Sequence, residues 1–185
     1  LKIPLERPRV MRQSVSNSTH SRRVISASDY MNVNNGCFGG DCIILCRDGS
    51  KQIKDLLKND IVITPYGDTQ IKCIIKTNAN TLIHRFESGL KITPYHPIRV
   101  NNEWVFPISQ LDSTQDYIDE IYNLVLEDYH IVYINDNEVI TLGHNYRDNK
   151  VVSHDYFGTN KIIEDLEKYD KKGYEDGYIL LEKDS

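Results

Sequence analysis

The chain has 185 residues, of which 39% are hydrophobic and 26% are charged, so it holds enough apolar material for one domain with extensions or for two small domains. Its net charge of −5 gives no electrostatic reason to expect nucleic acid or an acidic membrane as a partner. No apolar run approaches the ~20 residues that a membrane span needs, and the first residues lack the apolar stretch of a signal peptide. Because the chain does not begin with Met, we expect it to be a fragment of a longer protein.

Composition divides the chain into three parts. Residues 1–35 are predicted to be a flexible tail or a linker from an upstream segment, because "RQSVSNSTHSRR" is polar, basic and without a hydrophobic period. Residues 36–145 are predicted to form a β domain, since short strand-like runs alternate with turn formers such as "RDGS" and "YGDT". Residues 146–185 are predicted to be a C-terminal extension with a different, more charged character.

The β domain is predicted to contain many short strands, which makes the fold class all-β. The runs are rich in β-branched residues and tyrosine, as strands are. Only "SKQIKDLLKND" has helix-like spacing, which places Ile53, Leu56 and Leu57 on one face. The strand-like runs cover residues 42–46, 60–66, 69–77, 81–87, 90–100, 103–108, 122–127, 129–134 and 138–144.

The extension contains one helical pattern. Ile162, Ile163 and Leu166 recur at helical spacing in "NKIIEDLEKYDKKG". They predict one amphipathic helix that ends near Gly173. The acid-rich end of the chain is interpreted as a solvated face.

Three of the four cysteines are interpreted as structural. Cys42 and Cys46 flank "IIL", and Cys73 lies in "IKCIIK", so each is expected to be a small buried hydrophobe in a strand. The even count in a chain of this length without a secretion signal is weak evidence for disulfides. Zinc sites usually show tighter cysteine pairs, and we predict no metal.

Cys37 is different, because it follows Gly36 in "NNGCFGG". A thiol is a good nucleophile when part of it is thiolate, and a preceding glycine leaves the carbonyl open and permits strained backbone dihedrals. The pair therefore permits the thiol to attack its own preceding peptide bond and form a thioester. This shift is uphill for an ordinary amide, so the protein must distort the bond and protonate the leaving amine, usually with a histidine.

The first candidate donor lies in "LKITPYHPIRV", where Thr93 and His96 form a Thr-x-x-His unit. Pro94 and Pro97 cannot donate ladder hydrogen bonds, so this segment is predicted to leave the sheet or to lie at its edge. A side chain can face a site where a strand breaks in this way. The alternative is that His96 is an ordinary surface or core histidine.

A second group of candidates lies in "YNLVLEDYHIVYINDNEVITLGHN", which contains His130 and then His144 followed by Asn145. A neighbouring histidine can assist an asparagine side chain that attacks its own backbone carbonyl to form a succinimide. The alternative is structural, with Asn145 in a loop that follows a strand.

These blocks, in this order, resemble those of Hint domains, the module shared by hedgehog autoprocessing domains and inteins. The resemblance is carried over residues 36–145 by "GCFGGDCIILCRDGSKQIKDLLKNDIVI", "LKITPYHPIRV" and "YNLVLEDYHIVYINDNEVITLGHN". In addition "DYMNVNNGCFGGDC", "EWVFP", "VITLGH" and "HDYFGT" are similar to Vint, the variant found beside von Willebrand factor type A domains. The resemblance implies an intein-like horseshoe of many short strands with a short C-terminal α-containing extension.

The resemblance also implies roles for the first blocks. Cys37 matches the family nucleophile, and Gly36 matches the residue whose carbonyl is attacked. Thr93 and His96 match the pair that binds and protonates the scissile amide. The implied catalytic activity is a single-turnover, cysteine-dependent self-cleavage that needs no cofactor.

For the last blocks the resemblance implies roles in C-terminal steps for His130, His144 and Asn145. Inteins place Ser, Thr or Cys after the terminal Asn, whereas this chain has Tyr146, a poor acceptor whose phenol has a pKa near 10. We therefore do not expect full splicing.

Two further positions depart from the family pattern or lie outside it. Asn123 stands where family members often carry an aspartate, and an amide cannot shuttle a proton. His154, in the extension, is interpreted as an ordinary surface residue.

The expected function is therefore autoprocessing, with cleavage or transfer of the upstream segment. The expected partner is that segment in cis, which the resemblance suggests is a von Willebrand factor type A domain. The extension is too charged for an obvious sterol pocket. The alternatives are a non-catalytic Hint-fold module for interaction or spacing and a zinc-supported β module. The chemistry needs reduced cysteines, which favours the cytoplasm.

Overall fold

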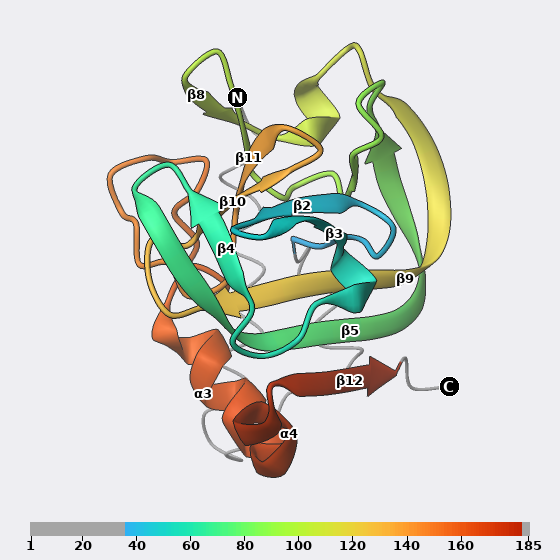
Figure 1. The fold of residues 1–185 in the computed structure, drawn as a ribbon. Helices are drawn as coiled ribbons and strands as arrows, with labels where there is room; N and C mark the ends of the chain where they lie inside the picture. Colours follow the sequence, from blue (N-terminus) through green and yellow to red (C-terminus); the bar gives the residue numbers. More distant parts are fainter. Residues whose placement is uncertain (1–35, 183–185) are drawn as a thin grey trace.

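The structure is a computed structural model that describes residues 36–182, so the tail or linker predicted over residues 1–35 lies outside the described residues. The described part is dominated by strands, which confirms the all-β prediction (Figure 1). Among these residues no helix is long and apolar enough to span a membrane. The elements are β1 (Phe38–Gly39), β2 (Ile43–Cys46), β3 (Gly49–Gln52), η1 (Ile53–Asp55), β4 (Ile61–Thr64), β5 (Gly67–Arg85), β6 (Lys91–Ile92), β7 (Ile98–Val100), β8 (Glu103–Val105), η2 (Pro107–Ser109), β9 (Thr114–Leu126), β10 (Ile131–Ile134), β11 (Asn137–Ile140), α3 (Asn160–Tyr169), α4 (Lys171–Asp176) and β12 (Tyr178–Glu182).

Two long antiparallel strands, β5 and β9, form the frame of the fold. They run side by side and curve together along their length (Figure 1). The register between them shifts between Asn78 and Thr81, and such an irregularity lets paired strands bend. Residues 69–77 and 81–87, which were predicted as separate strands, largely belong to the single strand β5.

The segment with helix-like spacing at residues 50–60 is not an α-helix. It begins within β3, which pairs with β2 along its whole length, and continues into the short 3-10 turn η1. The predicted apolar face does not exist, because Ile53 and Leu56 are buried whereas Leu57 is 67% exposed. The backbone hydrogen bonds between β3 and β2 stabilise the strand at the start of this segment in place of the predicted helix.

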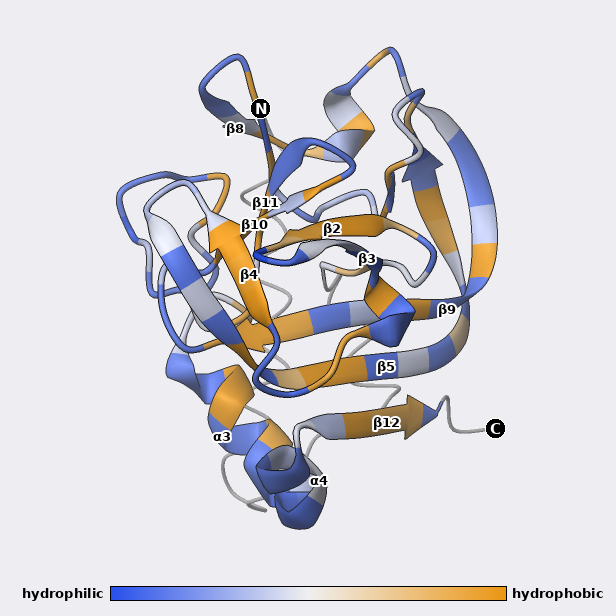
Figure 2. Cartoon of the chain, viewed as in Figure 1, coloured by the Kyte–Doolittle hydropathy of each residue, from blue (hydrophilic) through white to orange (hydrophobic). Residues whose placement is uncertain are grey.

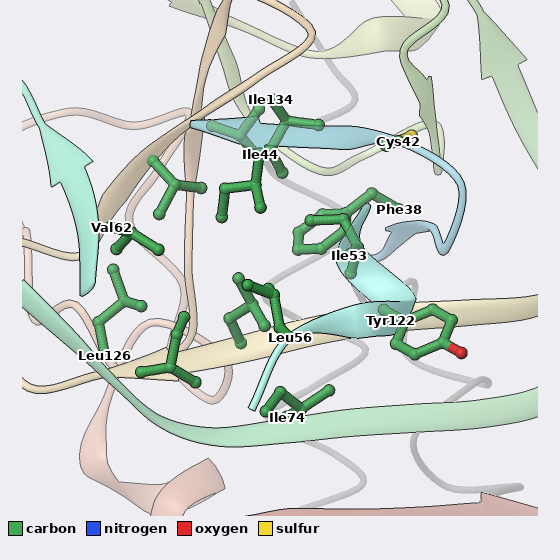
Figure 3. Close-up of a cluster of buried hydrophobic side chains, with 14 of the residues drawn as sticks. Phe38, Cys42, Ile44, Ile53, Leu56, Val62, Ile74, Tyr122, Leu126 and Ile134 are labelled. Atoms are coloured by element: carbon green, nitrogen blue, oxygen red, sulfur yellow. The ribbon is translucent and has the colours of Figure 1, made fainter. Parts of the chain in front are cut away.

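The buried side chains form two large clusters on opposite faces of the β5–β9 pair. Ile74 and Leu124 face the first cluster, here called the β core, while Ile75 and Val125 face the second, here called the extension core. Figure 3 shows the β core gathered around Phe38, the first residue of β1. A strand that buries both faces has a continuous apolar run, as "CII" in β5 does.

The extension forms two helices rather than the one predicted. Asp170 separates α3 from α4, with a non-helical backbone and a side chain that accepts the Gly173 N–H at 2.9 Å. The left-handed conformation of Gly177, at φ 90°, ends α4. In α3 the buried residues are Ile162 and Leu166, whereas Figure 2 shows α4 coloured mainly as hydrophilic.

The extension is built onto the β domain and shares its core. β12 joins the sheet in parallel beside β5, with Ile179 opposite Ile75. The extension core combines residues of β5 and β9 with residues of α3, α4 and β12. Residues 146–182 therefore pack with residues 36–145 around one common set of buried side chains.

This packing predicts a large difference between two neighbouring leucines of β12. Leu181 is fully buried in the extension core, whereas Leu180 is 41% exposed. We expect Leu181→Ala to lower the free energy of unfolding by about 2–5 kcal/mol and Leu180→Ala to change it by less than about 0.5 kcal/mol. Urea denaturation of both variants measures this, and equal effects would show that β12 does not dock as described.

Candidate functional site

The Gly36–Cys37 junction enters the interior of the sheet immediately before β1. Phe38 pairs with Ile92 of β6 on one side and with Tyr122 of β9 on the other. Cys37 is 1% exposed and belongs to the extension core. The short strand β1 thus places the predicted nucleophile between two segments that are distant in the sequence.

Thr93 holds the backbone of Cys37 on both sides. Its Oγ1 accepts the Cys37 N–H at 2.9 Å, and its own N–H donates to the Cys37 carbonyl at 2.9 Å. The first bond fixes the nitrogen of the Gly36–Cys37 peptide bond, which is the leaving group in an N-to-S shift. The chain leaves the sheet after β6 and returns at β7, as the two prolines in this segment predict.

Asn123 holds the other end of the same peptide bond, a contact that the sequence interpretation missed. Its Nδ2 donates to the Gly36 carbonyl oxygen, and its Oδ1 accepts the Leu124 N–H at 2.8 Å. The Leu124 contact fixes the orientation of the amide, because a backbone N–H can only donate. The side chain is buried, so its donor acts in an environment of low dielectric.

His96 packs directly against Gly36. A Cβ added to Gly36 would lie 2.7 Å from His96 Nδ1 and 2.8 Å from its Cγ, so the ring sits over the glycine Cα. His96 Nε2 lies 2.5 Å from the Ile140 carbonyl oxygen. A carbonyl only accepts, so Nε2 carries the proton of the neutral ring and Nδ1 has the lone pair. This ring can take a proton at Nδ1 and return it beside the junction.

A small cavity of about 20 Å³ lies beside this junction. Its wall combines the junction, the Thr-x-x-His segment, β9, the end of β11 and the extension. The lining residues are Gly36, His96, Pro97, Asn123, Ile140, Thr141, Leu142, His144, Val152, His154, Phe157 and Gly158.

His144 lines this cavity, and its hydrogen bonding fixes the tautomer of its ring. Its Nδ1 accepts the Tyr146 N–H at 2.8 Å, so the neutral ring carries its proton on Nε2. The ring stacks on Tyr146, with 5.2 Å between the ring centroids. His144 therefore presents an N–H donor and has no basic lone pair for the cavity.

His154 is not the surface residue that the sequence interpretation expected, since it is only 4% exposed and also lines the cavity. Its Nδ1 accepts the N–H groups of Tyr156 and Phe157, both at 3.1 Å. Its ring also packs on Phe157, with 5.0 Å between centroids. The turn at the start of the extension buries this histidine, and no local sequence pattern signals that packing.

The structure does not bring His130 or Asn145 to the cavity. The His130 ring lies near Tyr146, 6.4 Å between centroids, and His130 is absent from the cavity wall. Asn145 is exposed, and its Nδ2 donates to the Gly143 carbonyl at 3.3 Å and to Asn160 Oδ1 at 3.2 Å. Its side-chain nitrogen thus has two acceptors away from its own backbone carbonyl.

Burial lowers the pKa of His130, while the charge of Asp128 acts in the opposite direction. Below the ordinary histidine pKa of 6.5, the unfolded chain therefore binds a proton at His130 more readily than the folded chain does. The free energy of unfolding falls as the pH drops through this range. The slope for this residue stays under about 1.4 kcal/mol per pH unit, the limit for one proton. We expect His130→Asn, which suits the left-handed φ of 53°, to weaken this pH dependence.

Denaturant midpoints of the wild type and His130→Asn, measured between about pH 7.5 and pH 5.5, test this expectation. Burial lowers the pKa of His84 as well, so part of the slope should remain in the variant. A slope of stability against pH that is the same in His130→Asn and in the wild type would contradict the expected role of His130.

The remaining cysteines are buried thiols, as predicted. None of the four cysteines, which all lie within residues 36–182, forms a disulfide bond. Burial raises the pKa of the Cys42, Cys46 and Cys73 thiols, to about 12 for Cys73, which disfavours their thiolates. Within residues 36–182 no group of three or more His, Cys, Asp or Glu side chains could hold a metal ion.

The sequence profile of Vint, described as a Hint-domain, matches residues 36–184. The chain belongs to this family. The match includes nearly all of the extension, so the Vint domain of this chain is larger than the stretch over which the general Hint blocks were recognised. Membership supports an autoprocessing class of domain and leaves the mechanism to be proposed.

Solved structures similar to this Vint domain include inteins. The gp41-1 intein is 14% identical, with a TM-score of 0.47, and the match covers 58% of this chain and 99% of that one. A DnaB intein from Synechocystis sp. PCC 6803 is 19% identical over 58% and 99% of the two chains, with a TM-score of 0.46. A bacterial intein-like domain from Clostridium thermocellum is 17% identical over 57% and 96%, also at 0.46. No curated protein sequence matches the chain.

Proposed function

We propose that this Vint domain cleaves itself from the segment that precedes it. Cys37 Sγ attacks the carbonyl carbon of Gly36, the C–N bond breaks, and a C–S bond forms to give a thioester. The thiol proton passes through His96 Nδ1 to the leaving nitrogen, which becomes the free amino group of Cys37. The acyl group is then released or transferred to an acceptor.

The observation that carries this proposal is that both ends of one peptide bond are held. Asn123 donates to the Gly36 carbonyl oxygen, where negative charge develops during attack. Thr93 Oγ1 accepts the N–H of the leaving nitrogen. His96, the ring able to exchange a proton at Nδ1, lies on the Gly36 Cα. An ordinary strand peptide has no need of three converging side chains.

Full splicing is not part of the proposal. The Asn145 side chain donates to acceptors outside the cavity, and the hydroxyl of Tyr146 donates to the Tyr129 carbonyl at 2.7 Å. Neither side chain lines the cavity beside Gly36. The proposal therefore ends with cleavage or transfer at Gly36.

The test is a fusion of a reporter protein to the N-terminus of the chain, incubated with and without hydroxylamine and analysed by mass spectrometry. We expect a break between Gly36 and Cys37 that hydroxylamine accelerates, with Gly36 released as the hydroxamate. A Cys37→Ala fusion should stay intact. A wild-type fusion that stays intact with hydroxylamine would instead support the non-catalytic Hint-fold module.

A further inference from the structure

The carbonyl that contacts His96 belongs to a peptide group that is held at its other end as well. Its oxygen, on Ile140, lies 2.5 Å from His96 Nε2. The N–H of the same peptide group belongs to Thr141 and donates to the His130 carbonyl at 2.9 Å. Because a peptide group is planar and rigid, a bond that fixes its N–H also fixes the direction of its C=O. The contact with His130 therefore bears on the orientation of the His96 ring.

Thr141 makes a second bond to the same acceptor. Its hydroxyl donates to the His130 carbonyl at 3.0 Å, and the residue is buried. A hydrogen bond between buried groups is electrostatically stronger than one in water, and bonds in series across one peptide group polarise one another. The two bonds of Thr141 thus hold the peptide group in place and strengthen the contact between the Ile140 carbonyl and His96.

The hairpin of β10 and β11 brings these groups together (Figure 1). Its two-residue turn, residues 135–136, has φ of 47° and 66°, the left-handed pair that tight hairpin turns prefer. The ladder then runs from this turn to the pair Ile131–Ile140. One step further, Thr141 meets His130. The turn, which is distant from the junction in the chain, therefore sets which peptide group faces His96.

The His130 carbonyl reaches Thr141 through an unusual backbone. Tyr129 and His130 are consecutive left-handed residues, with φ of 69° and 53°, a region that is uncommon for residues other than glycine. Such conformations persist only where the surrounding structure enforces them. The Tyr146 hydroxyl donates to the Tyr129 carbonyl at 2.7 Å, and Thr141 donates to the next carbonyl. The strained pair is thus fastened at both of its carbonyls.

We propose that Thr141 is a positioning residue: it orients the Ile140 carbonyl, which keeps the proton of neutral His96 on Nε2 and the lone pair on Nδ1. The left-handed backbone of His130 supplies the carbonyl that anchors Thr141, and the His130 imidazole takes no part. This inference rests on the proposed function, in which His96 Nδ1 passes the thiol proton to the leaving nitrogen. A ring with its proton on Nδ1 has no lone pair there to accept that proton.

The first experiment observes the His96 tautomer directly. The chain is labelled with nitrogen-15 histidine in a Cys37→Ala background, which keeps the junction intact. Long-range proton–nitrogen NMR spectra at about pH 8, above the ordinary histidine pKa, distinguish the two neutral tautomers, and His96→Gln assigns the signals by their absence. We expect the proton on Nε2. A ring with its proton on Nδ1 overturns the inference without any variant of Thr141.

The second experiment compares threonine variants by the same spectra and by hydroxylamine-driven release from the reporter fusion. Thr141→Val keeps the volume and removes the hydroxyl, so we expect a mixture of His96 tautomers and release about tenfold slower, the size of one lost hydrogen bond. Thr141→Ser restores the hydroxyl and should recover most of the rate and the wild-type tautomer. A folded Thr141→Val with the wild-type tautomer and rate overturns the inference.

Thr81→Val is the matched control. The Thr81 hydroxyl is also buried and donates to a backbone carbonyl, that of Ala79 at 2.7 Å, but the residue lies outside the cavity wall. We expect this control to keep the wild-type tautomer of His96 and the wild-type rate. Equal effects of Thr81→Val and Thr141→Val would show a general loss of structure and would overturn the positioning role.

The third experiment separates the backbone of His130 from its side chain. His130→Asn and His130→Val both remove the imidazole, but asparagine adopts the left-handed region readily, whereas a β-branched residue is a genuine outlier there. We expect His130→Val to slow hydroxylamine-driven release about tenfold more than His130→Asn does. Equal losses overturn the backbone role. If hydroxylamine releases no segment even from the wild type, the proposed function fails, while the NMR spectra still show whether Thr141 sets the His96 tautomer.

Discussion

Replacing Asn123 with alanine should slow cleavage at Gly36–Cys37 by about 10²–10³-fold, the usual loss for one donor to a developing oxyanion. The Asn123 Nδ2 donates to the Gly36 oxygen, and its amide is held in that orientation by the Leu124 N–H. Because alanine leaves the oxygen buried without this donor, the tetrahedral intermediate loses more stabilisation than the ground state. The reporter fusion measures the rate as hydroxylamine-driven release.

Thr77→Val is the control for this change. Thr77 is a fully buried polar residue on β5, paired with Ile121 of β9, and among residues 36–182 its hydroxyl has no hydrogen-bond partner. We expect the control to fold and to cleave at the wild-type rate. Unfolding midpoints of both variants separate a loss of chemistry from a loss of structure. Normal cleavage by folded Asn123→Ala would remove the oxyanion role.

The sequence predicted the parts of the site that are local in the chain. Gly36 next to Cys37 is a reactive pair by its own chemistry. Thr93 and His96 are close because they are three residues apart in the turn between β6 and β7. The short strand β1 then brings these two segments together, with Phe38 paired to Ile92. For these residues, residue type and spacing were enough to predict which side chains take part in the site.

The parts that were missed depend on contacts between distant segments. Asn123 was interpreted only by what an amide cannot do, which is to shuttle a proton. Its use as a donor becomes visible only when β9 lies beside β1. His154 is buried because the extension folds back onto the end of the β domain, and no periodicity around it carries that information. The continuity of β5 was missed for the same reason, since its partner β9 carries the strand through the local turn signals.

Replacing Gly36 with alanine should lower the cleavage rate at least about 100-fold, the loss expected when a reacting group moves by about 1 Å. The new Cβ would approach His96 Nδ1 to 2.7 Å, a distance that real Cβ atoms essentially never show. The ring has little freedom to retreat, because its Nε2 is bonded to the Ile140 carbonyl and it packs 5.4 Å from the Phe38 ring. The free energy of unfolding should fall by about 1–3 kcal/mol as well.

Gly39→Ala is the matched control, since its added Cβ would meet Asp41, Lys91 and Ile118 side-chain atoms at 3.3–3.5 Å and lies away from the imidazole. We expect this control to keep most of its rate. A double-mutant cycle tests whether Gly36→Ala lowers the cleavage rate through His96. If it does, Gly36→Ala should lower the rate much less in a His96→Ala background than in the wild type, because the clashing ring is gone. Fully additive losses would show that Gly36 acts on the reaction independently of His96.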